Sequence, residues 1–276
     1  MSDEDRPGGG HVVTIPERAA ANVAWLFTEL PWKDRFAAAR RAGFSQVEFP
    51  WPDDPAQTAD AVRAAGIGVA MLNMDAGDLA AGERGWPNDP SRVEEWRTDF
   101  ADALALARDV GCRAINVLAG NAVRGVGVDA QLACFGQNVR WALPLAADDG
   151  VTLVTELLNR PENPAYLLAT LDDAEPLLRA LAPLGWKLQL DTWHLALTVA
   201  DVPAAIRRAA PHVGHVQVAD VPGRHEPGTG SLDWAAIGEA LRGYDGPIGL
   251  EYVPSGGTVD GLPGVAATGA WFSQPG

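Results

Sequence analysis

Short apolar runs and helical patterns alternate along almost the whole of this 276-residue chain. The apolar runs have the length and composition of buried strands, and the segments between them carry apolar residues at helical spacing. Such alternation predicts a parallel sheet with right-handed crossover helices, and eight repeats of the unit predict a closed barrel. The expected strands are residues 22–27, 46–49, 68–73, 114–118, 151–157, 187–191, 213–218 and 248–252.

Three segments show the helical pattern most clearly, and each stops at a glycine: residues 32–43, 90–111 and 129–150. The last helix is poorly defined, because residues 257–276 are rich in glycine. An open doubly wound sheet is the alternative architecture, but no Gly-rich dinucleotide turn follows the first strand. We therefore expect an α/β fold, a single-domain (β/α)8 TIM barrel over residues 20–276, after a flexible tail over residues 1–19.

Composition narrows the range of partners. The formal charge of −15 argues against nucleic acid, whose binding depends on Lys and Arg neutralising phosphates. Cys112 and Cys134 lie in apolar contexts, and so few cysteines form no disulfide framework. No run approaches the roughly 18 apolar residues of a membrane span, and the acidic, Gly-rich start is unlike a secretory signal. We expect a cytoplasmic protein that acts on a small molecule, and a homo-oligomer is compatible with the sequence.

Polar side chains stand near the ends of four neighbouring strands. Glu156 belongs to the fifth strand, Asp191 to the sixth and Glu251 to the eighth, while His215 and Gln217 share one face of the seventh. Barrels of this kind carry their chemistry at the carboxyl ends of the strands. Any one of these residues taken alone is more simply a capping or surface group. Four adjacent strands with the same feature at corresponding depths favour a common site.

Three carboxylates that converge without partners repel one another and lose solvation, so a cation between them is the simplest explanation. Glu156, Asp191 and Glu251, with the amide oxygen of Gln217, make an all-oxygen set of ligands. Such a set suits Mg²⁺ or Mn²⁺ better than a metal that prefers thiolate or imidazole, and zinc is less expected.

Six stretches resemble the hydroxypyruvate isomerase family, within the wider group of xylose-isomerase-like barrels. They extend over about residues 22–254, and the loop after the seventh strand is the most specific of them. The resemblance implies metal ligation by Glu156, Asp191, Gln217 and Glu251, with Glu156 and Glu251 also acting as acid and base. The stretches are "AGDLAAGERG" (76–85), "INVLAG" (115–120), "TELLNRPENPAYLL" (155–168), "LDTWH" (190–194), "GHVQVADVPGRHEPGTG" (214–230) and "YDGPIGLEY" (244–252).

The chain departs from the family pattern at four positions, none of which is a proposed ligand. Leu157 replaces the usual Pro, Ala165 a Gly, Ser231 a Glu, and Asn121 a basic residue. These changes leave room for an altered substrate pocket. In related ketose 3-epimerases the strand-seven ligand is usually His, so Gln217 favours the isomerases, although "DTWH" also resembles the epimerases.

The resemblance implies interconversion of hydroxypyruvate and tartronate semialdehyde through an enediolate. A metal would polarise the two reacting oxygens and a carboxylate would move the carbon-bound proton. The alternatives are isomerisation of 2-oxo-tetronate and 3-epimerisation of a ketose. A barrel endonuclease would need several metals and a basic groove. A non-catalytic sugar-binding protein would not explain why four neighbouring strands end in polar side chains that can bind a metal.

Other polar residues are candidates for substrate contact, each with a simpler structural alternative. His194 could bond a substrate oxygen, and His215 could orient a ligand or touch substrate. Arg224 offers a planar fork for a carboxylate, and Glu226 could anchor Arg224 or His225. The remaining candidates are Asn73, Asn116, Glu83 and Arg84, the last two near substrate or paired with each other, and the pocket-wall tryptophans Trp25, Trp51, Trp86 and Trp193.

Overall fold

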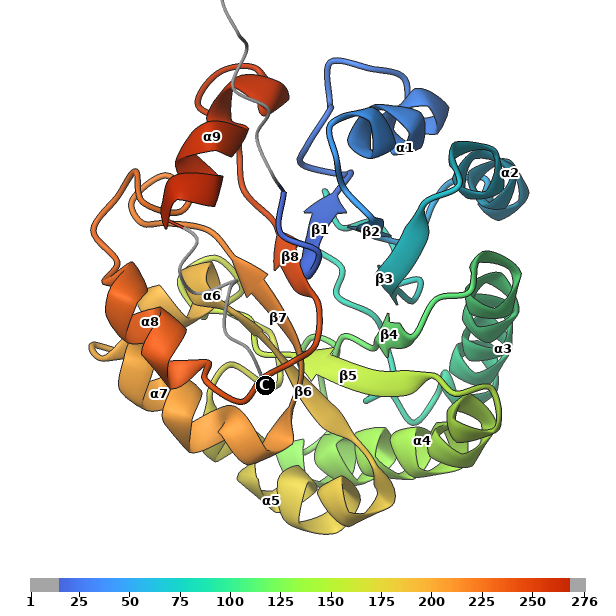
Figure 1. Cartoon of the computed structure of the whole chain (residues 1–276). Helices are drawn as coiled ribbons and strands as arrows, with labels where there is room; N and C mark the ends of the chain where they lie inside the picture. The colour runs from blue at the N-terminus through green and yellow to red at the C-terminus, as the bar shows by residue number, and fades with distance from the viewer. Residues whose placement is uncertain (1–14, 269–276) are drawn as a thin grey trace, which may run out of the picture.

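Eight parallel strands form the centre of the molecule and helices surround them (Figure 1). In this computed structural model, which describes residues 15–268, the strands pair in chain order and β8 pairs with β1 to close the barrel. The predicted single-domain (β/α)8 barrel is therefore confirmed. The strands are β1 (Ala19–Asn22), β2 (Gln46–Phe49), β3 (Gly68–Asn73), β4 (Ala114–Asn116), β5 (Thr152–Glu156), β6 (Lys187–Asp191), β7 (Val213–Val218) and β8 (Ile248–Leu250).

The helices cover the outside of the strands, and the three clearest predicted helices are confirmed as α1, α3 and α4. Local sequence sets their ends: before α2, the Asp54 side chain accepts from the Gln57 N–H, and Gly66, with φ of 60°, ends that helix. Residues 269–276 of the Gly-rich C-terminal segment lie outside the described residues. The helices are α1 (Trp32–Arg41), α2 (Pro55–Ala65), α3 (Val93–Val110), α4 (Val128–Asp148), α5 (Leu171–Leu181), α6 (Thr192–Ala196), α7 (Val202–Ala209), α8 (Trp234–Ala240) and α9 (Thr258–Thr268), with 3₁₀ turns η1 (Ala182–Leu184) and η2 (Ala210–His212).

The first strand lies earlier than predicted. Residues 22–27 were expected to form it, but β1 spans Ala19–Asn22 and its residues pair with β2 and β8. The apolar run that follows is a buried turn, in which Leu26 N–H bonds the Asn22 carbonyl and Phe27 has a φ of 60°. Alanine has little intrinsic preference for strands, so the pairing surface of the barrel, and not local composition, selects this segment.

The residues that the structure describes also include part of the tail expected over residues 1–19. Ile15 packs against the core, and the Arg18 guanidinium donates to the Gly246 carbonyl at 2.9 Å. This part of the expected tail is therefore part of the barrel. The remainder, residues 1–14, lies outside the described residues.

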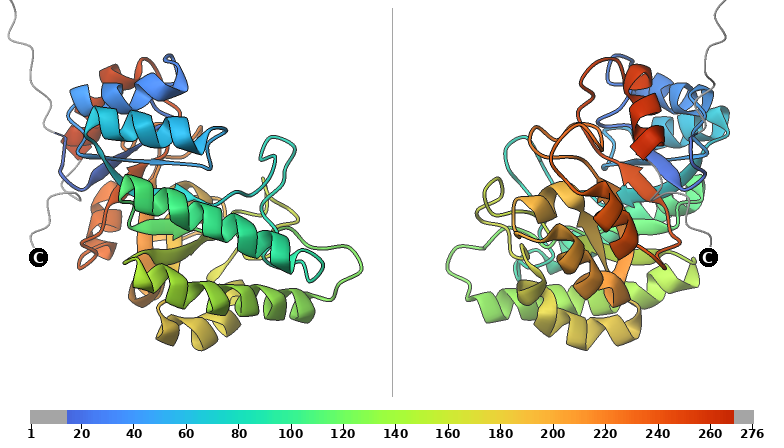
Figure 2. Two further views of the ribbon diagram at one scale, coloured as in Figure 1. Left: turned by 90° about the vertical axis from the view of Figure 1, so that its right-hand side faces the viewer. Right: turned by 60° about the vertical axis from the view of Figure 1, so that its left-hand side comes forward.

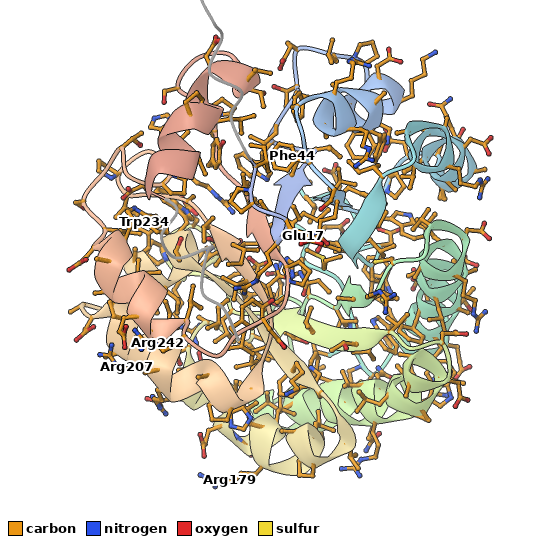
Figure 3. All side chains as sticks on the ribbon, in the orientation of Figure 1. Glu17, Phe44, Arg179, Arg207, Trp234 and Arg242 are labelled. Atoms are coloured by element: carbon orange, nitrogen blue, oxygen red, sulfur yellow. The ribbon has the colours of Figure 1, made fainter. Side chains whose placement is uncertain are left out.

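The core fills the layer between the strands and the helices. Phe36, Phe44 and Phe49 are fully buried there, whereas Arg179 on α5 and Arg207 on α7 point outward (Figure 3). Both cysteines are buried and free, as expected. None of the helices in the described chain is long and apolar enough to cross a membrane.

Candidate active site

Three carboxylates meet at the carboxyl end of the barrel, where long connections such as β3–α3 and β4–α4 extend outward (Figure 2). Glu156 ends β5, Asp191 ends β6, and Glu251 follows β8 directly. Glu156 and Asp191 are buried and Glu251 is partly buried. His194 joins them, with its Nε2 lying 3.7 Å from a Glu156 oxygen and 3.8 Å from an Asp191 oxygen. The strand ends therefore bring these four side chains together.

The imidazole of His194 is held by the start of α6 and by the β5–α5 loop. Asp191 accepts from the Trp193 N–H at 2.9 Å, which begins the short helix and turns His194 toward the acids. The Nδ1 atom of His194 accepts from the Asn159 main-chain N–H at 3.1 Å. Burial lowers the pKa of His194 to about 4, so the ring is neutral at pH 7. Because Nδ1 accepts a hydrogen bond, the single ring proton lies on Nε2. We therefore assign His194 as a hydrogen-bond donor that faces the carboxylates.

Arg224 supplies positive charge between two of the acids. Its Nη2 lies 2.8 Å from an Asp191 oxygen and 3.0 Å from a Glu251 oxygen. The guanidinium also stacks over the ring of Trp25, 4.5 Å from the centroid. The fork that we expected to face a substrate carboxylate is thus engaged with the carboxylates of the protein.

The surroundings of Glu156 and Glu251 disfavour the ionised forms of both side chains. Burial, followed by the charge of Asp191, raises the pKa of Glu156 to about 8. Burial also raises the pKa of Glu251 well above its ordinary value, although Arg224 opposes this shift. One arginine therefore compensates three converging carboxylates only in part, and a further cation would favour their ionised forms.

The side chains present fit a hard divalent cation. One oxygen of Glu156, one oxygen of Asp191 and one ring nitrogen of His194 lie within 4.8 Å of one another. Because His194 carries its proton on Nε2, the carboxylates are the better ligands of this group. Carboxylate oxygens suit Mg²⁺ or Mn²⁺.

A cavity of about 500 Å³ adjoins the carboxylates. Charged and neutral polar side chains line part of it, and apolar side chains line the rest. The lining residues are Asn22, Ala24, Trp25, Pro50, Asn73, Leu79, Arg84, Leu118, Glu156, Leu158, Glu162, Asn163, His194, Arg224 and Glu251. A larger cavity of about 610 Å³ opens beside the first residues of strands such as β3 and β4, at the opposite end of the barrel. Barrels of this type carry their chemistry at the carboxyl end of the strands, so we assign the cavity of about 500 Å³ beside the carboxylates as the candidate active site.

Two residues predicted for the site lie in a polar layer inside the barrel. His215 Nε2 lies 2.6 Å from one oxygen of Glu48, and Gln217 donates to the other at 2.7 Å. The amide oxygen of Gln217 accepts from Gln189 at 2.6 Å. Neither His215 nor Gln217 lines the cavity. Metal ligation by Gln217 and substrate contact by His215 stay predictions.

Glu226 does not anchor Arg224 or His225, in contrast to our expectation. Its carboxylate accepts from the Ser255 N–H at 2.9 Å and from the Ser255 hydroxyl. These bonds fix the segment that leads from β8 to α9. Glu226 is not among the residues that line the cavity, and its buried carboxylate is satisfied by this neighbouring segment.

The two charged residues of the β3–α3 loop have different positions. Glu83 accepts from the Asp78 N–H at 2.7 Å and closes the loop on itself, outside the set of cavity-lining residues. Arg84 lines the cavity, and its Nε donates to Asn163 at 2.8 Å. Glu83 and Arg84 are not an ion pair, since Arg84 bonds only the main-chain carbonyl of Glu83. At the end of β3, Asn73 also lines the cavity.

The segment after β5 contributes residues that sequence reasoning missed. Glu162 lines the cavity and accepts from Asn159 at 3.0 Å and from Trp193 at 3.1 Å. Burial opposes its ionisation, but these hydrogen bonds together with nearby positive charge, including that of Arg224, lower its pKa. The signal available was a cluster of polar residues, "NRPEN", directly after the strand that ends in Glu156.

The tryptophans expected to wall the pocket divide between two roles. Trp25 lines the cavity, and Trp193 holds Glu162. Trp51 borders a separate hollow of about 300 Å³, and Trp86 packs beneath the Arg92 guanidinium, 3.8 Å from its ring centroid. Only the first two therefore bear on the candidate site.

Comparison with known proteins places this architecture in a family. The sequence pattern of the xylose isomerase-like TIM barrel family matches residues 36–272, and the chain belongs to this family.

Particular relatives extend the likeness over nearly the whole chain. A 2-oxo-tetronate isomerase from Cupriavidus necator is 36% identical over 249 residues, which cover 89% of this chain and 96% of the relative. A hydroxypyruvate isomerase from Escherichia coli is 31% identical over 249 residues, with the same coverage. A crystal structure described as an AP endonuclease, family 2, from Brucella melitensis has a TM-score of 0.83 at 33% identity and covers 93% of this chain and 98% of its own. The expected enzyme class, an isomerase resembling the hydroxypyruvate isomerases, is confirmed.

Proposed function

We propose that this enzyme is a metal-dependent isomerase of a short hydroxy-keto acid, with hydroxypyruvate and tartronate semialdehyde as the reacting pair. The observation that carries the proposal is the convergence of Glu156, Asp191 and Glu251 around Arg224 and neutral His194, with Glu156, Glu251 and His194 lining one cavity. This arrangement offers anionic ligands, groups that exchange protons, and a neutral donor for a substrate oxygen.

Glu156, Asp191 and Glu251 would hold Mg²⁺ or Mn²⁺, with Gln217 as the fourth predicted ligand. When bound, the metal would polarise the carbonyl and the adjacent hydroxyl of the substrate and favour the negative charge that develops on them. The amide oxygen of Gln217 accepts from Gln189 at 2.6 Å and has a second lone pair, which ligation would use.

Glu156 and Glu251 would carry the proton. One of them takes a proton from C3 of hydroxypyruvate, and the same or the other carboxylate returns a proton to C2, while the proton of the C3 hydroxyl passes to the C2 oxygen so that C3 becomes the aldehyde carbon. Burial raises the pKa of both carboxyls, that of Glu156 to about 8, so that each side chain can hold an abstracted proton until it is returned. His194 would donate from Nε2 to a substrate oxygen, and Glu162 would bind a hydroxyl at the cavity wall.

Isomerisation of 2-oxo-tetronate is the second candidate, because the Cupriavidus necator relative with that name is 36% identical. It requires the same proton chemistry on a longer acid. A ketose 3-epimerase is less favoured, because Gln217 stands where those enzymes usually carry His. Endonuclease activity is disfavoured by a formal charge of −15 and a carboxylate-rich site, both of which repel a phosphate backbone.

Metal removal tests the proposal. The protein is stripped with a chelator and assayed for conversion of hydroxypyruvate, 2-oxo-tetronate and a panel of ketoses, before and after addition of Mn²⁺ or Mg²⁺. We expect conversion of one acid only after metal is restored. Full activity in the stripped protein contradicts the metal, and activity on ketoses alone contradicts the acid substrate.

A further inference from the structure

The cavity contains two arginines with different surroundings. Arg224 faces protein acceptors: its Nη2 contacts Asp191 and Glu251, and its Nε points to the main-chain carbonyl of Glu251 at 3.4 Å. Removing this guanidinium from its partners would expose two carboxylates to mutual repulsion. Arg224 is thus a poor receptor for another anion.

Arg84, by contrast, keeps donors in reserve. Its Nε donates to the Asn163 side chain at 2.8 Å, and its Nη1 donates to the carbonyls of Leu79 and Glu83 at 3.1 and 2.6 Å. Within residues 15–268 its Nη2 has no hydrogen-bond acceptor, and its guanidinium forms no ion pair. A half-buried cation on the cavity wall therefore has two N–H groups available to a ligand.

The loop that carries Arg84 is fixed before any ligand binds. Gly85 N–H bonds the Ala76 carbonyl at 2.8 Å, and Gly120 N–H bonds the Arg84 carbonyl at 3.1 Å. Gly77 has a φ of 80°, and a Cβ there would lie 2.2 Å from a carboxylate oxygen of Glu83. The backbone thus presents Arg84 in one position, which reduces the conformational entropy lost on binding.

Arg84 lines the same cavity as Glu156 and Glu251. An anionic substrate entering this cavity meets several carboxylates, so a cation that they do not already engage is needed to favour its binding.

We propose that Arg84 is the specificity-determining residue that binds the substrate carboxylate through Nη2 and so selects keto acids over neutral ketoses. This inference rests on the proposed function and assigns the carboxylate to Arg84 in place of Arg224. The two substrates that separate these classes are hydroxypyruvate and dihydroxyacetone, which differ by one carboxylate in place of a CH₂OH group.

The test compares Arg84→Gln with the unchanged, metal-loaded enzyme by solvent deuterium exchange on both substrates. We expect kcat/KM for hydroxypyruvate to fall roughly 10- to 100-fold, the loss of one charged hydrogen bond, and kcat/KM for dihydroxyacetone to change by less than about twofold. Arg84→Lys keeps the charge and should recover part of the loss. Arg124→Gln removes an equal charge from the exposed β4–α4 loop and should leave kcat/KM unchanged for both substrates.

An equal fall in kcat/KM for both substrates in Arg84→Gln would overturn the proposal, because it would indicate that Arg84 acts only through its hydrogen bond to Asn163. Unchanged kcat/KM for both substrates would also overturn it. Calorimetric binding of D-glycerate separates this proposal from the proposed function, since glycerate has a carboxylate and no carbonyl to isomerise. Weaker glycerate binding by Arg84→Gln supports the carboxylate receptor even if the enzyme converts neither substrate. Equal affinity of the two proteins for glycerate contradicts it.

Discussion

The acids of the candidate site differ in their hydrogen-bond partners. Asp191 receives a guanidinium bond and a main-chain N–H, whereas Glu156 has a longer bond of 3.4 Å from the Asn116 amide. The sequence could predict Glu156, Asp191 and Glu251, because each is an acid at or just beyond the end of an apolar run. Glu48 was missed, although it alternates with Val47 and Phe49 in β2 and so points into the barrel.

Glu251→Gln tests the acid–base assignment. The raised pKa of Glu251 means that the folded chain disfavours its ionised form, so a neutral isostere should leave the Tm unchanged or slightly higher. We expect kcat to fall roughly 10²- to 10⁴-fold, measured by conversion of hydroxypyruvate with circular dichroism as the folding control.

Glu226→Gln is the matched control, because Glu226 is a buried glutamate that holds Ser255 outside the cavity. It should lower the Tm and leave kcat nearly unchanged. Unchanged turnover in Glu251→Gln would contradict the assignment of Glu251.

Strands and loops differ in how far local sequence determines them. Strands β2, β3, β6 and β7 have the predicted bounds, because turn residues or helix ends flank their apolar runs. Strand β1 was misplaced because barrel closure overrides the weak strand preference of an alanine run. The contacts of the β3–α3 loop could not be predicted, since they join residues far apart in the chain, such as Arg84 and Asn163.

Gly77→Ala tests whether this loop positions the cavity wall. Alanine at a φ of 80° is strained, and its Cβ would displace Glu83 from the bond that closes the loop. We expect a lower Tm and a higher KM for the acid substrate, with a smaller change in kcat.

Gly82→Ala is the comparison, because Gly82 has a φ of 91° in the same loop but open space at its Cβ. It should lower the Tm through backbone strain alone and leave KM close to the original value. If both variants raise KM equally, displacement of Glu83 is not the cause.

At the scale of the whole molecule, eight strands gather acids that lie far apart in the sequence into one cavity. Alternation of strands and helices is a property of the entire chain, so the architecture could be predicted although one strand was misplaced. The substrate could not, because the contacts that distinguish an acid from a sugar come from loops. A chain with a formal charge of −15 nevertheless places Arg84 in the cavity, a single cation that no acid of the described chain engages, which favours a small anion over a polyanion.

The central claim is that cavity carboxylates move a carbon-bound proton of hydroxypyruvate. Its most direct test is the conversion of hydroxypyruvate in D₂O by the metal-loaded enzyme, followed by proton NMR. The account predicts that deuterium enters at C2 as product forms, because the carboxylate that takes the C3 proton exchanges it with solvent before a proton is returned to C2. Product that keeps the original hydrogen at every turnover would contradict proton transfer by Glu156 or Glu251 and indicate a direct hydride shift.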